Sequence, residues 1–196
     1  MAIYLSLLLD YLFGDPKFLP HPVVLVGKLV AFYEKLFYPQ NRGQSYFRQG
    51  VLLVLAVLLT VGLALGALLM WLGRWPLVQF LVGVYLLYAA LAWRSLQVEP
   101  GYVVSALRSG NLPRAHKMLS YVVGRDTENL NNQQILKATL ETIAENTIDG
   151  VLAPLFYMCL GYFWLGLPGA VVLAWLYKAV NTMDSMVGYK NERYRE

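Results

Sequence analysis

The sequence predicts an all-α, polytopic helical membrane protein with a cytoplasmic helical insert. Two observations indicate a membrane protein. Apolar residues make up 58% of the chain and charged residues 14%, whereas a soluble domain has about 25% charged residues. The charges are also absent from runs as long as the roughly 20 apolar residues that a spanning helix needs. A third observation excludes a β fold, because strand-like alternation of apolar and polar residues is scarce.

Residues 1–50 are expected to form a short helix, a proline-rich loop and an interfacial helix. Ala2–Phe13 is apolar but short for a span and contains Asp10, so we interpret it as a partly inserted helix. It does not have the basic start and cleavage site of a secretory signal. Three prolines in seven residues then hold the backbone extended. This loop is either a rigid connector or a surface that presents Asp15 and His21 to a ligand.

Residues 51–93 are predicted to form a transmembrane hairpin. Neither 51–73 nor 75–93 contains a charged residue, and Arg74 separates the two runs. Each run is long enough to cross the bilayer once. The tryptophans beside Arg74 stand where interfacial aromatic residues are expected.

Residues 94–149 are polar, and we expect them to form the helical insert. Helices are predicted over 102–108, 112–123 and 133–146, with breaks at glycine and asparagine positions between them. Asn131 and its neighbour supply an N-cap for the third helix.

Residues 150–196 contain a third uncharged run, 150–177, followed by a polar C-terminal motif. This run is longer than one crossing needs, and the Pro168-Gly169 pair near its middle is typical of a turn. A membrane hairpin and one interrupted helix both fit, and we favour the hairpin.

Basic residues are concentrated in 14–50, 94–149 and the C-terminal motif. Because basic loops mark the cytoplasmic side, we expect 14–50 and 94–149 to face the cytoplasm. The net charge of +4 then reflects membrane topology, and we expect no nucleic-acid partner.

Familiar nucleotide and metal motifs are absent from the sequence. It contains neither GxxxxGK[ST] nor GxGxxG, and its single cysteine, Cys159, excludes an intramolecular disulfide. His21 and His116 are too isolated in the sequence to propose as a metal pair.

Arg125 begins a polar stretch that also contains Asp126 and Glu128. The stretch is either a solvated loop or a ligand site. In the second case Arg125 binds phosphate or carboxylate in a bidentate manner, and an acidic neighbour helps to hold a metal ion.

Glu141, Glu145 and Asp149 are spaced i, i+4, i+8, and no basic residue lies between Lys137 and Lys178. Like charges at this spacing are mildly destabilising on a helix. A divalent cation would relieve them, and Mg²⁺ typically uses one or two carboxylates plus substrate phosphates. The alternative is a solvated helix face.

Lys178, Asn181, Asp184 and Ser185 fall three or four residues apart, so they share one helix face. This face indicates a polar pocket at the end of a membrane helix. The alternative is an interfacial helix end with a snorkelling lysine.

Four stretches carry a family resemblance: LLLDYLFGDPKFLPHPVVLVGKLV at 7–30, LSYVVGRDTENL at 119–130, ATLETIAENTIDGVLAPLFY at 138–157 and YKAVNTMDSMVGYKNERY at 177–194. Through them the chain resembles the CbiB/CobD family of adenosylcobinamide-phosphate synthases. Members of this family continue beyond the fourth stretch. We therefore expect the chain to be either an N-terminal portion of a longer protein or a naturally short form.

The resemblance implies a multi-pass enzyme of the cell membrane. Such an enzyme joins adenosylcobyric acid to (R)-1-amino-2-propanol or its phosphate by an amide bond, with ATP and Mg²⁺. The implied partners are the corrinoid, the amino alcohol and the lipid bilayer. A homo-oligomer and contacts with other cobalamin-assembly enzymes are left open.

The resemblance also suggests positions for the site, to which residue chemistry adds roles. Acidic residues would hold Mg²⁺ or act in catalysis, basic residues would bind phosphate, and asparagines would orient substrate amides. The expected metal ligands are Glu141, Glu145 and Asp149; the catalytic set adds Asp184 and Lys178. Expected to bind substrate or phosphate are Asp15, His21, Arg125, Asp126, Asn146, Asn181 and Lys190.

Two other functions compete with the synthase. One is a non-catalytic membrane signalling or sensory protein related to AmpE. The other is a small transporter, which is disfavoured because 51–93 contains a single charged residue and the polar clusters lie outside the apolar runs.

Overall fold

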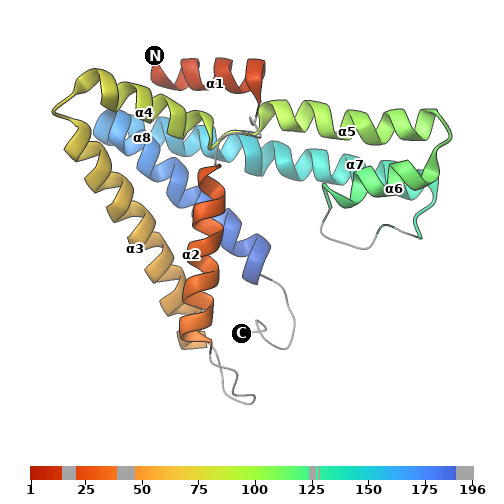
Figure 1. Cartoon of the computed structure of the whole chain (residues 1–196), viewed down its shortest axis with the longest axis horizontal. Coiled ribbons are helices and arrows are strands. Elements are labelled where there is room, and N and C mark those ends of the chain that lie inside the picture. Colours follow the sequence, from red (N-terminus) through yellow and green to blue (C-terminus); the bar gives the residue numbers. More distant parts are fainter. Residues whose placement is uncertain (15–20, 39–46, 124–126, 128, 189–196) are drawn as a thin grey trace.

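The computed structural model describes residues 1–14, 21–38, 47–123, 127 and 129–188, and within them it contains helices and no strand, as predicted. The elements, most of which Figure 1 labels, are α1 (Ala2–Phe13), α2 (Pro22–Phe37), α3 (Phe47–Leu72), α4 (Pro76–Tyr88), α5 (Trp93–Arg108), α6 (Leu112–Ser120), α7 (Asn132–Thr147), the π-helical turn η1 (Ile148–Leu152) and α8 (Ala153–Val187).

Three helical stretches are long and apolar enough to cross a membrane: Phe47–Leu72, Pro76–Arg108 and Asn132–Val187. Many large apolar side chains of α3 point outward, including Leu55, which is 52% exposed, and Leu63, which is 69% exposed. An outer apolar surface of this kind suits lipid rather than water. The chain is therefore a helical membrane protein.

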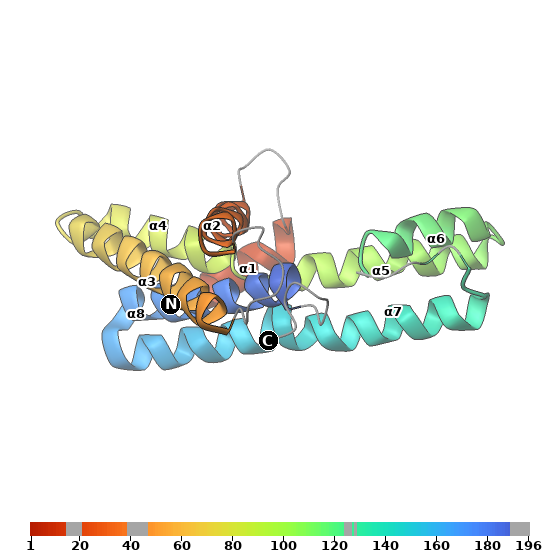
Figure 2. The same cartoon turned by 90° about the horizontal axis from the view of Figure 1, so that it is seen from below.

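The helix α8 folds back on itself near its middle. Leu165 and Gly166 leave the helical region, and Gly166 has a φ of 63°, which glycine adopts without steric cost. Beyond this point Tyr177 returns alongside Tyr157, and their rings stack with centroids 5.2 Å apart. Figure 2 shows the two halves side by side. Of the two arrangements considered for 150–177, the structure contains the one that reverses.

The reversal does not use the Pro168-Gly169 pair that predicted a turn. It occurs earlier, at Leu165 and Gly166. Pro168 instead lies in the first turn of the returning half, where its fixed φ suits the start of a helix and its missing N–H costs nothing.

The apolar run 75–93 is not one helix, as a simple hairpin would require. The helix α4 ends at Tyr88 and α5 begins at Trp93. Two long-range hydrogen bonds stabilise this break: the Ala92 N–H donates to the Gly150 carbonyl at 3.0 Å, and the Trp93 N–H donates to Asp10 Oδ2 at 2.7 Å. A helix can be interrupted in apolar surroundings when other parts of the protein satisfy its backbone.

Asp10 explains why α1 lies against the start of α5. Its side chain is buried, and its carboxylate accepts a hydrogen bond at the N-terminal end of α5, where the helix dipole favours a negative charge. The prediction that α1 is partly inserted in the membrane stays untested.

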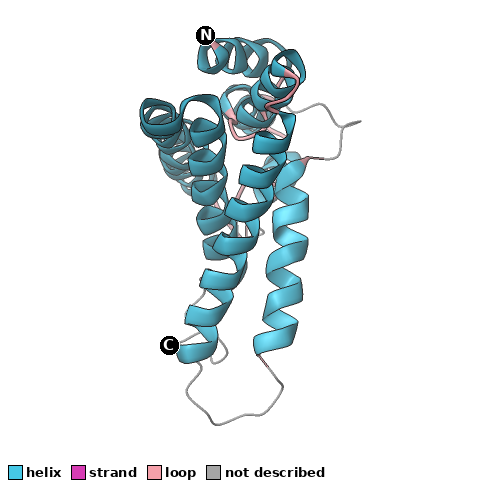
Figure 3. Ribbon diagram, turned by 90° about the vertical axis from the view of Figure 1, so that its left-hand side faces the viewer, coloured by secondary structure: helices cyan, strands magenta, loops and turns pink. Residues whose placement is uncertain are grey.

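The buried apolar residues form two separate cores. The larger joins the apolar helices and includes Leu53, Leu87 and Trp175; the Trp175 indole N–H donates to the Leu86 carbonyl at 2.9 Å. The smaller joins α5, α6 and α7 around Leu119 and Ile135. Figures 1 and 2 show that α5, α6 and α7 project from the other helices as an arm. Figure 3, viewed from the side opposite to the arm, shows that the described part of the chain consists of helices and loops.

Local sequence signals account for the helices of the arm. The Asn111 side chain accepts from the Arg114 N–H at the start of α6, and Asn131 and Gln134 form a capping box at the start of α7. The predicted cap at Asn131 is confirmed. The structure differs in extent, since α5 already begins at Trp93 and α6 ends at Ser120.

Candidate functional site

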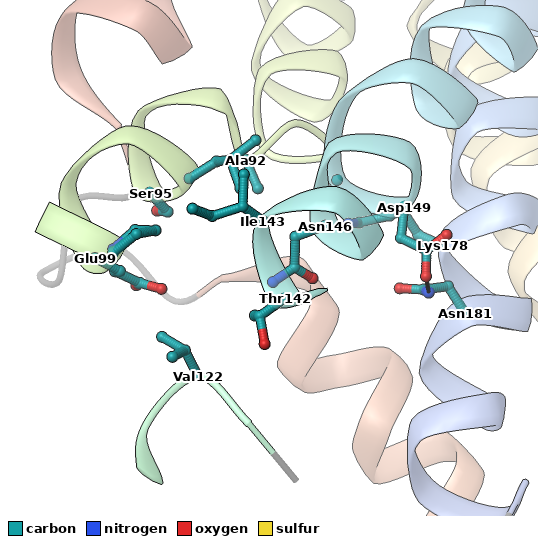
Figure 4. A pocket seen from close by; sticks show the side chains of 13 residues that line it. Ala92, Ser95, Glu99, Val122, Thr142, Ile143, Asn146, Asp149, Lys178 and Asn181 are labelled. Atoms are coloured by element: carbon teal, nitrogen blue, oxygen red, sulfur yellow. Dashed lines mark hydrogen bonds between the residues drawn. The ribbon is translucent and has the colours of Figure 1, made fainter. Parts of the chain in front are cut away.

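A cavity of about 220 Å³, lined by both polar and apolar residues, opens where the arm meets the apolar helices. Figure 4 shows its walls, which come from α5, α7, η1 and α8, with Val122 added from the turn after α6. The polar residues in its lining are Ser95, Glu99, Thr142, Asn146, Asp149, Lys178 and Asn181. The break between α4 and α5 positions one wall, because the Ala92 N–H binds the Gly150 carbonyl beside Asp149.

Two hydrogen bonds anchor the side chain of Asp149 in the cavity wall. The Tyr177 hydroxyl donates to its Oδ1 and the Asn181 amide to its Oδ2, each at 3.0 Å. These bonds join η1 to the returning half of α8 across about thirty residues of sequence. Because one donor holds each oxygen, the carboxylate has a defined orientation, and its remaining lone pairs can still accept.

Asp149 lies in a π-helical turn, an uncommon geometry that is often found at functional sites. Gly150, in the same turn, is buried and uses its carbonyl to hold the start of α5. A side chain at Gly150 would come within 3.2 Å of the Ala92 Cβ. The lack of a side chain therefore allows α5 and η1 to approach closely and form the cavity wall.

The three carboxylates predicted to share one helix face do not point in the same direction. Glu141 and Glu145 are exposed, and Glu141 lies 3.8 Å from Lys137, whereas Asp149 lies in the cavity wall. On an α-helix, residues eight positions apart differ by about 80° in direction. This angle lets Asp149 contact α8 while Glu141 faces solvent.

Four of the expected site residues line the cavity together: Asn146, Asp149, Lys178 and Asn181. Others lie elsewhere. Glu141, Glu145 and Asp184 are exposed and outside the lining. His21 is the N-cap of α2, where its Nδ1 accepts from the Val23 N–H at 3.3 Å. Outside the described residues lie Asp15, Arg125, Asp126 and Lys190.

Four residues around the cavity were not expected from the sequence. Ser95, Glu99 and Thr142 line it, and Tyr177 binds Asp149. Tyr177 belongs to one of the stretches that carry the family resemblance, which was an available signal. No signal in the sequence identified Glu99 as a site residue. It lies 50 positions from Asp149, and the local sequence pattern does not determine how its helix packs.

The described residues do not contain a ready-made metal site. Among them, no three His, Cys, Asp or Glu side chains lie close enough together to hold a metal ion. Glu141, Glu145 and Asp149 thus do not fit a pre-formed three-carboxylate centre in this arrangement. The expectation of Mg²⁺ stays a prediction.

Comparison with known proteins identifies a protein family. The family model described as CobD/Cbib protein matches residues 3–196. Cobalamin biosynthesis protein CobD of Geobacter metallireducens is 47% identical over 98% of this chain, and its namesake in Halalkalibacterium halodurans is 46% identical over 100%. Cobalamin biosynthesis protein CbiB of Salmonella typhimurium is 41% identical over 100% of the chain.

The chain is shorter than these relatives. It spans 58% of the Geobacter and Halalkalibacterium proteins and 59% of the Salmonella protein. No solved structure matches the chain significantly.

Proposed function

The chain belongs to the CobD/CbiB protein family, and from this premise we propose that it acts in cobalamin biosynthesis as an amide-forming enzyme. The proposed reaction joins a carboxylate of adenosylcobyric acid to the amine of (R)-1-amino-2-propanol or its phosphate. The observation that supports this role is the cavity, in which four helical segments bring carboxylates, amides and a lysine together at the boundary between the arm and the apolar helices.

The proposed chemistry needs an activated acid. ATP transfers its terminal phosphoryl group to the carboxylate and leaves as ADP. The amine nitrogen then attacks the acyl carbon, phosphate departs with the carboxylate oxygen, and the nitrogen loses a proton. The overall products are the amide, ADP and phosphate.

Residues of the cavity suit parts of this reaction. Lys178 supplies a positive charge for phosphate oxygens. Asn146 and Asn181 offer amide donors and acceptors. Asp149 fixes the position of Asn181, and therefore of the wall that Lys178 shares. Mg²⁺, when bound with a nucleotide, would neutralise charge on the transferring phosphoryl group.

We expect the activity to require ATP and Mg²⁺. Membranes that contain the chain should form the amide from adenosylcobyric acid and 1-amino-2-propanol, or its phosphate, as measured by mass spectrometry. Omission of ATP or addition of EDTA should reduce product to the level of membranes without the chain.

The same assay separates the alternatives. Product that persists in EDTA would show the Mg²⁺ requirement to be wrong. A correctly inserted, well-expressed chain that forms no product would contradict the ligase proposal for this chain, as a non-catalytic signalling role related to AmpE predicts.

We also propose that the protein resides in the cell membrane with 14–50 and 94–149 in the cytoplasm. The concentration of basic residues in both segments supports this orientation. In a chain with Cys159 replaced by serine, a cysteine at Lys117 on α6 should react with an impermeant maleimide in inverted vesicles and not in intact cells. Reaction in intact cells would reverse the proposed orientation.

A further inference from the structure

We propose that α2 lies in the membrane interface and that its outer face binds the headgroups of anionic phospholipids. The outer face of α2 is defined by five exposed residues: Leu25, Lys28, Phe32, Lys35 and Leu36. The inference extends the expectation of an interfacial helix, because it names the class of lipid that the helix binds and the residues that bind it. This lipid site is separate from the cavity and does not depend on the ligase activity.

The opposite face of α2 is fixed against the apolar helices. Val26 and Val30 are buried in the larger core, and the Tyr33 hydroxyl shares a hydrogen bond of 2.8 Å with the Thr60 hydroxyl of α3. The helix packs against both α3 and α8. Its rotation about its own axis is therefore set by the protein, and the outer face is turned away from the core.

Two contacts place α2 across the ends of its neighbours. A Cβ at Gly27 would lie 3.7 Å from the sulfur of Met186, next to the last residue of α8. A Cβ at Gly50, in the first turn of α3, would lie 3.1 Å from the Tyr38 hydroxyl. These ends of α8 and α3 lie away from their hairpin turns, and Figure 1 shows the lower end of α2 beside the start of α3. Since α3 is long enough to span the bilayer, its end reaches the interface.

The length of α2 and its charges favour a position along the interface. The helix has 16 residues and is about 24 Å long, whereas the hydrocarbon core is about 30 Å thick. Lys28 and Lys35 are both exposed, and a lysine in contact with hydrocarbon is costly. A helix that lies along the membrane surface lets both ammonium groups reach the level of the headgroups.

The charged and apolar residues are segregated around the outer face of α2. Lys28 and Lys35 are seven residues apart, so they point within about 20° of each other and lie about 10 Å apart along the axis. Leu25, Phe32 and Leu36 are 65%, 60% and 59% exposed, and they follow on one side at about 40° to 100° from the lysines. The apolar side can therefore enter the hydrocarbon while the lysines extend to the headgroups.

The charge of the outer face selects an anionic headgroup. The exposed residues of α2 include both lysines and no acidic residue, and Glu34 points about 100° or more away from them. Within the described part of the chain, neither lysine takes part in an ion pair. Lipid phosphates supply the opposite charge. A second copy docked by the same face would instead bring four lysines together, which like-charge repulsion opposes.

Binding is tested by native mass spectrometry of the purified chain in detergent, titrated with phosphatidylglycerol and separately with phosphatidylcholine. The double variant Lys28→Gln with Lys35→Gln should weaken phosphatidylglycerol binding by about 25-fold, since each lysine contributes about fivefold to the affinity for an anionic lipid. It should leave phosphatidylcholine binding unchanged, which reports an intact fold. An excess of glycerol phosphate should not displace the lipid, because it offers the phosphate without the acyl chains.

The matched control is Arg114→Gln with Lys117→Gln on α6, which removes the same charge from the arm. This control should bind both lipids as the wild type does. An equal loss of phosphatidylglycerol binding in the two double variants would show an effect of net charge alone and overturn the site on α2. Unchanged binding in the α2 variant would also overturn it, as would displacement of the lipid by glycerol phosphate.

The position of α2 is tested by nitroxide labels on the chain in phosphatidylglycerol bilayers, with Cys159→Ser as the background. A label at Phe32→Cys should be the more accessible to oxygen, which concentrates in hydrocarbon. A label at Lys35→Cys should be the more accessible to a water-soluble nickel chelate. Equal accessibility of the two positions to both reagents would overturn the interfacial orientation.

Discussion

Asp149→Ala is expected to lower amide formation by about a hundredfold and to destabilise the protein by about 2 kcal/mol. The carboxylate is the shared acceptor for Tyr177 and Asn181. Its removal leaves two partly buried donors without their acceptor, and each unsatisfied donor lowers the free energy of unfolding by roughly 1 kcal/mol. The wall beside Lys178 then loses its fixed position, and misplacement of about 1 Å in a reacting site costs about a hundredfold in rate.

Amide formation in membranes and thermal unfolding in detergent measure these two effects. Asp149→Asn retains the shape of the side chain and one of the two acceptors, so it should recover about half of the lost stability. Glu34→Ala, outside the cavity, is the control for removal of a carboxylate. Wild-type activity of Asp149→Ala at equal expression would show that Asp149 does not organise the site.

Gly161→Leu is expected to prevent formation of the reversed α8 and to remove nearly all folded protein. A side chain at Gly161 would overlap the backbone of Gly169 on the returning half. The overlap involves carbonyl and backbone atoms rather than the end of a flexible side chain, so local repacking cannot relieve it. The two halves would have to separate, and the contact between Asp149 and Asn181 would separate with them.

The measurement is the yield of monodisperse protein on size-exclusion chromatography in detergent, with thermal unfolding of whatever is recovered. Gly66→Leu on α3 is the matched control, because a side chain there meets nothing within 4 Å. Gly66→Leu should leave the yield unchanged. Glycine inside a helix is itself destabilising, by about 0.5–1 kcal/mol relative to alanine, so its replacement in open space carries no cost of this kind. Normal yield and stability for Gly161→Leu would contradict the close approach of the two halves.

The sequence alone determined the features that depend on neighbouring residues. Long uncharged runs identified the apolar helices, because a membrane span depends on the sum of local hydropathy. Asn131 and its neighbour identified the start of α7, because a cap is formed within a single turn; the structure adds Gln134 as the second member of the capping box. Four of the cavity residues were also anticipated, since Asn146, Asp149, Lys178 and Asn181 stand out as polar groups beside apolar helices.

Only the tertiary structure decided how these elements combine. The break at Ala92 depends on acceptors at Asp10 and Gly150, which are distant in the sequence. Glu99 joins the cavity through the packing of α5, and Asp149 separates from Glu141 because just one of them meets α8. Local propensity ranks the backbone conformations of each segment, but contacts between segments satisfy buried polar groups and so select where a helix breaks and which side chains meet.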